Sequence, residues 1–539
     1  MNSHCLPFRQ IPHSTRLFLD YLDHLPAVQP FFPRSARFRE WVENEVQNEV
    51  QNIRYPSDRR NLVADILERQ SRIFGASPRT LENLAAFRAG ALALVTGQQV
   101  GLFGGPAFAI YKALSAVKLA EEARRTGLSC VPIFWLATED HDLEEVNQAG
   151  IPAADTQLER ITSAARGPAD APVGTIRFGP DISETVLRVQ GLLGECEAAK
   201  LLADCYRPGE TFGTAFARFF SALFAEFGVI LLDGSDAELD RIAAPLYRQV
   251  IEQAHELNNS LLERDQQLQS AGYHQQVRIT STSTPLFLMS NGSRVAVHLG
   301  AGGTFVAGTE TLTQKQLVAR AESSPHSFSP NVLLRPVIQD YLLPTVAYVG
   351  GAAEVAYFAQ AAPLYRGLNG RITPIVPRFS ATLVEAKPKA LLERYELSFL
   401  DLLHGPEPLR EKIGARLLDP ALQQSFDQAG AAVERTMTAV RDALARLDKT
   451  LIESAANAES KMLYQLTNLR ARAARAELRQ SEVAERHARF LSNTLYPGKT
   501  LQEREVAGVY FLAKQGRELL GQLLEMIHPD CVDHQLVTL

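Results

Sequence analysis

The stretch that decides the fold covers residues 92–112 and reads LALVTGQQVGLFGGPAFAIYK. It begins with an apolar run, passes through a turn that holds four glycines and continues as a helical pattern. A buried strand that leads through such a turn into a helix is typical of a parallel sheet with helical crossovers. The stretch therefore predicts one strand–turn–helix unit.

Four later segments repeat this pattern of an apolar run, a glycine or acidic end and a following helix. Together the five segments predict an α/β fold, a doubly wound core with a parallel sheet over about residues 80–385. The four segments read CVPIFWLATEDHD (130–142), GVILLDGSD (228–236), PTVAYVGG (344–351) and TPIVPRF (373–379).

Two stretches interrupt the strand–helix alternation. The first, about 150–210, has little periodicity and is rich in Ala, Pro and Gly, so we interpret it as an insertion. The second, about 257–330, alternates apolar and polar residues around an Asn291-Gly292 pair, as antiparallel hairpins do. We therefore expect residues 1–385 to form the core, with these two connecting segments inserted in it.

After about residue 390 the pattern changes to a heptad repeat, with charged residues outside the apolar seam. This predicts an α-helical coiled coil over 386–510, and the alternative is one amphipathic helix that lies on the core. A helix of about 55 residues would extend about 80 Å, so it requires a partner helix from this chain or from a second protomer. We expect residues 511–539 to pack on the core. The seam residues are Val433, Met437, Val440, Leu444, Leu447, Leu451, Met462, Leu466, Leu469, Ala473 and Ala476.

Composition argues against several classes of protein. The chain has 55 basic and 61 acidic residues without long blocks of one sign, so nucleic acid is not an expected partner. Its apolar runs are too short for a membrane span and its start lacks an export signal, so we expect a cytoplasmic protein without a membrane partner. Five scattered cysteines predict reduced thiols and no cysteine metal site.

The glycine turn after the first strand predicts an anion site, because backbone N–H groups and the helix dipole attract negative charge there. The spacing G-x3-G-x2-G-G is not a dinucleotide fingerprint, and no Walker lysine follows. The alternative is a turn that is merely tight, with a solvated lysine. The candidate binding residues are Gly97, Gln98, Gln99, Gly101, Gly104, Gly105, Tyr111 and Lys112.

The second strand ends in four consecutive ionisable residues, Glu139, Asp140, His141 and Asp142, at the edge where open α/β sheets bind ligands. His141 between carboxylates is a candidate general base. Four adjacent residues cannot all face one ion and H-E-x-x-H is absent, so we expect no metal. The alternative is a solvated helix start that Asp140 or Asp142 caps.

The later strands add a third group of candidates. Gly350 and Gly351 form a turn, Glu354 lies in the first turn of the following helix, and Arg378 ends the last strand. These groups would suit both ends of a small zwitterion. The alternative is that they serve as caps and ion pairs.

Five segments together resemble the BshC family, the cysteine-adding enzymes of bacillithiol biosynthesis, over nearly the whole chain. The resemblance implies a Rossmann-type core with two inserted connecting segments and a coiled coil that makes a homodimer. The chain departs from the family pattern at Ala352 and Ala353, where a Pro-Gly pair is usual. The segments read VTGQQVGLFGGPAFAIYK (95–112), PIFWLATEDHDLEEVN (132–147), RPVIQDYLLPTVAYVGGAAEVAYF (335–358), PIVPRFS (374–380) and LQERE (501–505).

The resemblance also implies a reaction. A ligase joins the carboxylate of cysteine to the amine of glucosaminyl-malate (GlcN-Mal) and forms an amide, giving the low-molecular-weight thiol bacillithiol. We hypothesise that the glycine turn and Lys112 hold an anionic group while His141 with Asp140 deprotonates the attacking amine.

Activation of the carboxylate suggests ATP or ADP as a cofactor. The ATP signatures of class I aminoacyl-tRNA synthetases, H-x-G-H and K-M-S-K-S, are however absent from the sequence. Two alternatives remain open. One is a noncatalytic, regulatory dimer that binds a nucleotide, and the other is a transferase that uses pre-activated cysteine.

Overall fold

A computed structural model describes residues 2–42, 53, 55–153, 157–168, 170–290 and 293–539. The chain divides into two compact units. The division falls between residues 382 and 383 and between 502 and 503, where the sequence predicted boundaries at 385 and 510. The first unit contains Met1–Ala153, Glu159–Thr382 and Glu503–Val537, and the second contains Ala154–Leu158, Leu383–Gln502 and Thr538–Leu539.

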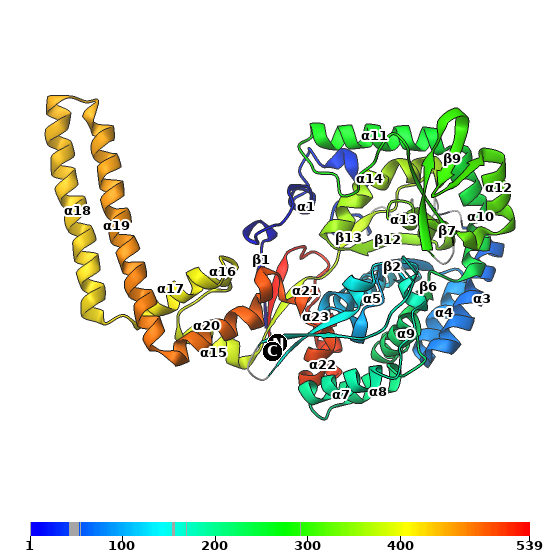
Figure 1. The fold of residues 1–539 in the computed structure, drawn as a ribbon, viewed down its shortest axis with the longest axis horizontal. Helices are drawn as coiled ribbons and strands as arrows, with labels where there is room; N and C mark the ends of the chain where they lie inside the picture. The colour runs from blue at the N-terminus through cyan, green and yellow to red at the C-terminus, as the bar shows by residue number, and fades with distance from the viewer. Residues whose placement is uncertain (1, 43–52, 54, 154–156, 169, 291–292) are drawn as a thin grey trace. The chain divides into compact units, whose positions relative to one another are not determined.

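A five-stranded parallel sheet of order β13-β12-β2-β3-β6 forms the centre of the first unit (Figure 1). Of these five strands, the central strand β2 comes first in the chain, β3 and β6 then follow on one side of it, and β12 and β13 follow on the other. The direction of winding therefore reverses between β2 and β12, which confirms the predicted doubly wound topology. The strands are β2 (Leu92–Gln98), β3 (Cys130–Leu136), β6 (Ile230–Asp233), β12 (Thr345–Gly350) and β13 (Ile375–Pro377), one from each predicted segment.

Both faces of this sheet are covered. Leu92 and Leu94 of β2 belong to an apolar cluster with Leu119 of α5 (Ala107–Arg125). The alternate residues Ala93 and Val95 belong to the larger cluster that includes α3 (Ser57–Phe74), α4 (Pro78–Arg88) and α14 (Ala352–Leu368). Burial on both sides explains why the strands are continuous apolar runs in the sequence.

Two segments are inserted in the strand–helix alternation. The first, between β3 and β6, contains α6 (Leu143–Val146), the paired strands β4 (Gln148–Pro152) and β5 (Leu158–Thr162), and the helices α7 (Ile182–Leu193), α8 (Glu197–Cys205) and α9 (Phe212–Leu223). The second, between β6 and β12, contains α10 (Ala237–Glu252), α11 (Ala254–Ser270), α12 (Gln314–Ser323), α13 (Arg335–Leu342) and five further strands.

Those five strands form an antiparallel sheet of order β10-β9-β8-β7-β11. The pairing of β7 with β8 matches the predicted hairpin, and its predicted turn, Asn291 and Gly292, lies outside the described residues. The strands are β7 (Ser283–Ser290), β8 (Ser293–Leu299), β9 (Thr304–Ala307), β10 (Glu310–Thr313) and β11 (Phe328–Pro330).

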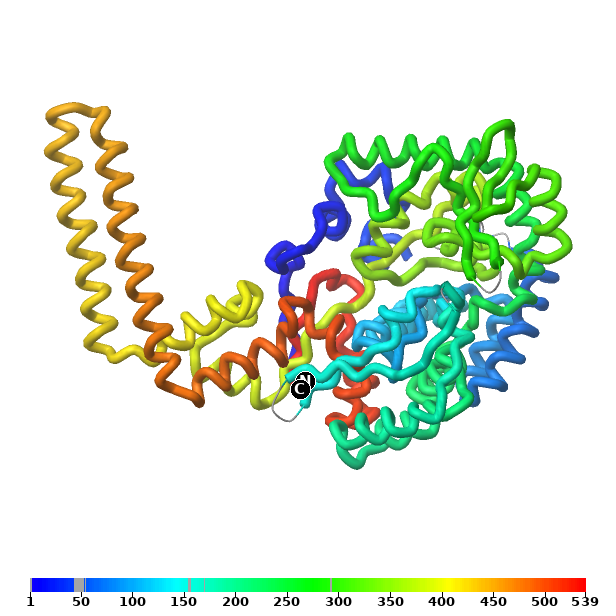
Figure 2. Tube along the Cα trace, in the orientation of Figure 1, coloured from blue at the N-terminus to red at the C-terminus, as the bar shows by residue number. Residues whose placement is uncertain are grey.

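The heptad region of the second unit is a helical hairpin of α18 (Pro420–Leu447) and α19 (Leu451–Gln480), which lie side by side (Figure 2). The prediction of one helix of about 55 residues is therefore wrong. The chain turns at Asp448, whose Oδ1 accepts hydrogen bonds from the N–H and the hydroxyl of Thr450, both at 2.8 Å. The coiled-coil partner of each half is thus the other half of the same chain.

Ion pairs support this hairpin, with Arg441 to Glu459 at 3.1 Å and Arg470 to Asp427 at 2.9 Å. The remaining helices of the second unit are α15 (Ala386–Arg394), α16 (Phe399–Leu403), α17 (Pro406–Leu417) and α20 (Glu482–Leu495). No helix in the described ranges combines the length and the apolar character that a membrane crossing requires.

The end of the chain returns to the first unit. Helices α22 (Gly508–Gln515) and α23 (Glu518–Met526) contact α5, and α21 (Gln502–Glu505) precedes them. A three-stranded sheet of order β1-β15-β14 contains β1 (Asn2–Leu6), β15 (His534–Thr538) and β14 (Ala381–Val384). Segments from opposite ends of the chain are therefore neighbours in the first unit.

Candidate functional site

A cavity of about 270 Å³ lies at the carboxyl ends of the central strands, and we call it the switch-point cavity. Its walls include Gln98, Ala137, Gly351 and Arg378, which end or directly follow β2, β3, β12 and β13. The reversal of strand order between β2 and β12 leaves a crevice at this edge of the sheet, and doubly wound proteins bind ligands there. The cavity therefore lies at the edge of the sheet where the sequence predicted a binding site.

Charges of both signs line the switch-point cavity. Predicted residues that line it are Gly97, Gln98, Gln99, Lys112, Asp140, Gly351, Glu354 and Arg378. Residues there that the sequence did not select as site candidates include Phe108, Trp135, Glu145, Arg335, Gln339, Tyr348, Tyr357 and Arg504.

Lys112 is buried in the wall of this cavity, with 3% of its surface exposed. Its Nζ donates to the carbonyl oxygen of Gly97 at 2.7 Å and to Oε1 of Gln98 at 2.9 Å, and lies 2.6 Å from Oε2 of Glu354. Burial lowers the pKa of Lys112, and the charge of Glu354 opposes that effect. All three ammonium protons thus have protein acceptors, so Lys112 holds the wall together.

Both carboxylate oxygens of Glu354 also have partners within the protein. Its Oε2 accepts the N–H of Gly351 at 2.7 Å, which caps the start of α14, and its Oε1 accepts the hydroxyl of Tyr348 at 2.8 Å. Lys112 is the third partner of this carboxylate. These three contacts favour the alternative that Glu354 serves as a helix cap and as one half of an ion pair.

Arg378 forms a bidentate pair with Glu503, whose side chain is 1% exposed, at 2.6 and 3.0 Å. Burial raises the pKa of Glu503, but the charge and the hydrogen bonds of Arg378 lower it by more, so the net shift is downward. Arg504 follows directly, and both guanidinium groups lie over the ring of Phe108. The segment LQERE therefore supplies a buried anchor and a cation to the wall.

The four consecutive ionisable residues after β3 separate in space. Asp140 lines the switch-point cavity, where its Oδ2 accepts from Nε2 of Gln99 at 2.9 Å and its Oδ1 accepts from the N–H of His141 at 3.0 Å. Burial raises the pKa of Asp140, but Arg335 and these hydrogen bonds outweigh it, so the net shift is downward. Asp140 is thus held as a carboxylate.

His141 and Asp142 do not line the switch-point cavity. Nδ1 of His141 lies 3.0 Å from Nη1 of Arg294, which has no lone pair to offer, so Nδ1 acts as the acceptor. Asp142 caps α6 by accepting the N–H of Glu145 at 2.9 Å. The geometry therefore gives His141 no direct access to the switch-point cavity.

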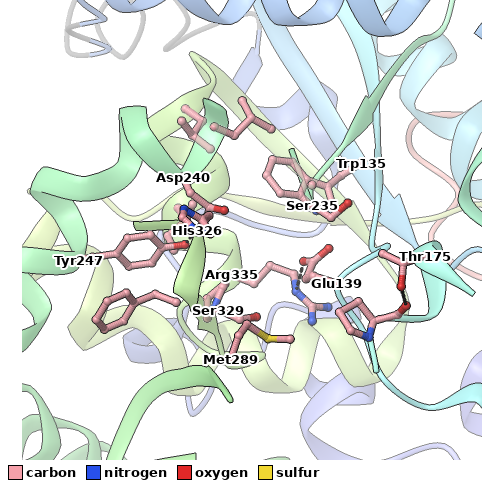
Figure 3. A pocket seen from close by; sticks show the side chains of 17 residues that line it. Trp135, Glu139, Thr175, Ser235, Asp240, Tyr247, Met289, His326, Ser329 and Arg335 are labelled. Atoms are coloured by element: carbon pink, nitrogen blue, oxygen red, sulfur yellow. Dashed lines mark hydrogen bonds and ion pairs between the residues drawn. The ribbon is translucent and has the colours of Figure 1, made fainter. Parts of the chain in front are cut away.

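Glu139 lines a second cavity, of about 190 Å³ (Figure 3). This cavity shares Trp135 and Arg335 with the switch-point cavity. Oε1 of Glu139 lies 2.9 Å from Nε of Arg335, and burial raises the pKa of Glu139 against the effect of that arginine. On another wall, Asp240 of α10 accepts the hydroxyl of Tyr247 at 2.9 Å. Burial raises the pKa of Asp240 to about 8.

The glycine turn itself is closed by protein groups. The N–H of Gly104 donates to the hydroxyl of Tyr206 at 3.0 Å, and that of Gly105 donates to the carbonyl of Leu102 at 3.0 Å. Both glycines have positive φ, and a Cβ at Gly104 would lie 2.7 Å from the ring of Phe219. These contacts favour the alternative of a tight turn over an anion site. Gly101, Gly104, Gly105, Tyr111 and Gly350 line neither cavity.

Sequence reasoning missed several wall residues. Arg504 carried a signal, because it lies in a segment that resembles a known family. Asp240 carried none, since its position depends on how α10 packs beside the second insertion. Among the described residues, no group of three or more His, Cys, Asp and Glu side chains is arranged to hold a metal ion.

A doubly wound Rossmann-like core with a charged cavity at its switch point, followed by a coiled-coil hairpin, is the architecture of a protein that binds a small molecule. Family profiles specify the class. One described as "Bacillithiol biosynthesis BshC, N-terminal Rossmann-like domain" matches residues 1–379, and one described as "Bacillithiol biosynthesis BshC, C-terminal coiled-coil domain" matches 381–539. The chain belongs to the BshC family.

Individual relatives agree over the full length. A protein of Koribacter versatilis is 45% identical over 533 residues, 99% of each chain, and one of Solibacter usitatus is 36% identical over 537 residues, also 99% of each. A protein of Salinibacter ruber is 32% identical over 535 residues, 97% of this chain and 96% of its own. All three bear the name "Putative cysteine ligase BshC".

Proposed function

We propose that the protein is a cytoplasmic cysteine ligase of bacillithiol biosynthesis, which forms an amide between the carboxylate of cysteine and the amine of GlcN-Mal. The observation that carries this proposal is the mixed charge of the switch-point cavity. Its arginines suit the malate carboxylates of GlcN-Mal, and Asp140 suits an amine. The family and the names of its members agree with this chemistry.

In this proposal Asp140 contacts the attacking amine, accepts hydrogen bonds from it and takes up its proton as the C–N bond forms. Gln99 orients the carboxylate through its 2.9 Å hydrogen bond. His141 lines no part of the cavity and acts on the site through its neighbours, since its Nδ1 lies 3.0 Å from Nη1 of Arg294 and 3.6 Å from Oδ1 of Asp140. This replaces the predicted role of His141 as the group that deprotonates the amine.

Amide formation also requires that one carboxylate oxygen of cysteine leaves, and a phosphoryl or adenylyl group from ATP would make it a leaving group. We propose ATP as the co-substrate. Arg504 offers positive charge to its phosphates, whereas Arg378 is paired with Glu503 and the N–H groups of Gly104 and Gly105 are bonded within the protein.

The test is a mass-spectrometric assay of the purified protein with cysteine and GlcN-Mal, with and without ATP. We expect bacillithiol only with ATP. Asp140→Asn should lower kcat at least about a hundredfold, within the range of a general base. Glu144→Gln, an exposed carboxylate nearby, is the matched control and should turn over like the native protein.

The other outcomes separate the alternatives. Product without ATP would support the transferase that uses pre-activated cysteine, which the absence of synthetase signatures also favours. If no product forms under either condition, the ligase proposal fails and the regulatory dimer becomes the better account.

We also propose that the protein is a homodimer through the α18–α19 hairpin. Several apolar side chains of this hairpin remain solvent-exposed within one chain, which is costly over a contiguous surface. Light scattering should give twice the chain mass, and Met462→Glu with Leu469→Glu should give the monomer. Leu187→Glu, at an exposed leucine of α7, is the control. The exposed residues are Leu422, Val440, Leu447, Ile452, Met462, Tyr464 and Leu469.

A further inference from the structure

The second cavity is built like a ligand site, although the reaction proposed above uses only the switch-point cavity. Several side chains in its walls are buried yet carry unsatisfied polar atoms, and Glu139 and Ser329 are two of them. Oε2 of Glu139 and Oγ of Ser329 have no hydrogen-bond partner in the described part of the chain, and the two residues are 8% and 6% exposed. A buried polar atom without a partner costs about 1–3 kcal/mol, so such atoms at one cavity point to a missing partner.

The charge of the cavity specifies that partner. Glu139 and Asp240 face one space, and the charge of Glu139 helps to raise the pKa of Asp240 after burial, the larger cause (Figure 3). Tyr247 and His326 are the other titratable side chains there, and Arg335 compensates only Oε1 of Glu139. A cation between the two carboxyl groups would relieve their repulsion and satisfy the free oxygen.

The shape and the remaining walls narrow the cation to a small organic ammonium. The cavity measures about 190 Å³, and a cavity of about 150 Å³ accepts a molecule as large as benzene. Most of the other side chains in the wall are apolar, so a short uncharged side chain can bind there without a large cost in desolvation free energy. These apolar residues are Leu239, Met289, Phe328, Ile338 and Leu342.

Arg335 gives the ligand a direction. Arg335 lines both cavities, so a carboxylate bound to it would lie at their shared wall while an ammonium on the same molecule reaches Glu139 and Asp240. An α-amino acid with a short side chain meets all these conditions.

We propose that the second cavity binds the cysteine substrate, with its ammonium between Glu139 and Asp240, its carboxylate at Arg335 and its thiol among the apolar side chains. The inference rests on the proposed ligase function. It explains a selectivity that this reaction needs: an amine held as ammonium has no lone pair, so cysteine cannot attack a second activated cysteine. The amine of GlcN-Mal in the switch-point cavity then remains the nucleophile.

The test is equilibrium dialysis of labelled L-cysteine against the full-length protein under reducing conditions. We expect saturable binding that Asp240→Asn and Glu139→Gln each weaken at least about tenfold, as loss of a charge-assisted hydrogen bond predicts. Glu238→Gln, an exposed carboxylate on the same helix, is the control and should bind within about twofold of the native protein. Met289→Trp, which fills the cavity without removing a charge, should abolish binding even if Glu139→Gln does not fold.

Competing ligands test the proposed contacts. We expect 3-mercaptopropionate, which lacks the ammonium, not to displace cysteine, and cysteamine, which lacks the carboxylate, to displace it weakly. Equal displacement by 3-mercaptopropionate, or unchanged cysteine binding in Asp240→Asn and Met289→Trp, would overturn the inference.

The same variants separate this inference from the ligase proposal. If the native protein forms bacillithiol and Asp240→Asn leaves KM for cysteine unchanged, the cavity assignment is wrong and the ligase stands. If the protein forms no bacillithiol but binds cysteine in a manner that Asp240→Asn and Met289→Trp abolish, the ligase proposal is wrong and the cavity still binds the amino acid.

Discussion

Lys112 of α5 and Glu354 of α14 form a buried ion pair, 2.6 Å between Nζ and Oε2, in the wall of the switch-point cavity. The two helices follow β2 and β12, the strands between which the winding direction reverses. The pair therefore ties together the two halves of the doubly wound fold at the place where they would otherwise separate. Its role is to keep the cavity in shape.

Replacing Lys112 by methionine should destabilise the protein by about 3–5 kcal/mol, because it leaves the buried carboxylate of Glu354 without its cation. Adding Glu354→Gln should recover part of that loss, since the double variant buries no unpaired charge. Urea unfolding measures both, with Lys118→Met on the same helix as the control. If the two losses are simply additive, the pair contributes no coupling energy.

Cys5 and Cys531 lie close together, with 2.8 Å between their sulfur atoms. We expect diamide to join them within one chain, the two thiols giving two electrons and two protons to the oxidant. Mass spectrometry of peptides from the unreduced protein should find this link, and Cys5→Ser should remove it. A link from Cys5 to Cys196 instead would show that the chain ends are not arranged as described.

The sequence predicted the five parallel strands because burial on both faces leaves continuous apolar runs. It also placed Gln98, Gly351 and Arg378 correctly at one edge, since the carboxyl ends of parallel strands meet there. Such patterns are local and need no knowledge of distant contacts.

The features that sequence reasoning missed all depend on distant or subtle signals. The heptad seam continues across Asp448, and no glycine or proline marks the turn between α18 and α19. The N–H of Gly104 donates to the hydroxyl of Tyr206, more than a hundred residues later, so the sequence of the turn does not reveal that this N–H is occupied. The second cavity needs Glu139 and Asp240 from two separate elements, and no spacing rule joins them.

His534 should make the protein sensitive to acid. Burial lowers the pKa of this histidine to about 4, and its ring nitrogens lie 2.7 and 2.9 Å from the hydroxyls of Ser380 and Thr382. Between pH 6.5 and 4 the unfolded chain binds a proton there that the folded chain does not, so stability falls as the pH falls.

The expected loss from His534 is up to about 3 kcal/mol across that range. Urea unfolding at several pH values measures it, and His534→Gln should show a shallower decline, whatever its stability at pH 7. An equal slope in the native protein and the variant would assign the acid sensitivity to other groups.

Asp240 should have the opposite pH dependence. With a pKa of about 8, the folded chain keeps a proton on this carboxyl that the unfolded chain releases above about pH 4, its ordinary value. Stability contributed by this group is therefore present below pH 4 and declines as the pH rises towards 8. Asp240→Asn, which cannot ionise, should be more stable than the native protein by up to about 5 kcal/mol at pH 8 and similar to it near pH 4. Urea unfolding of both proteins between pH 4 and pH 8 checks this, and parallel curves would mean that Asp240 is already ionised in the folded chain.

Saturating cysteine should stabilise the native protein more than Asp240→Asn, because an ammonium beside the carboxylate lowers the pKa of Asp240 and removes the cost of ionising it.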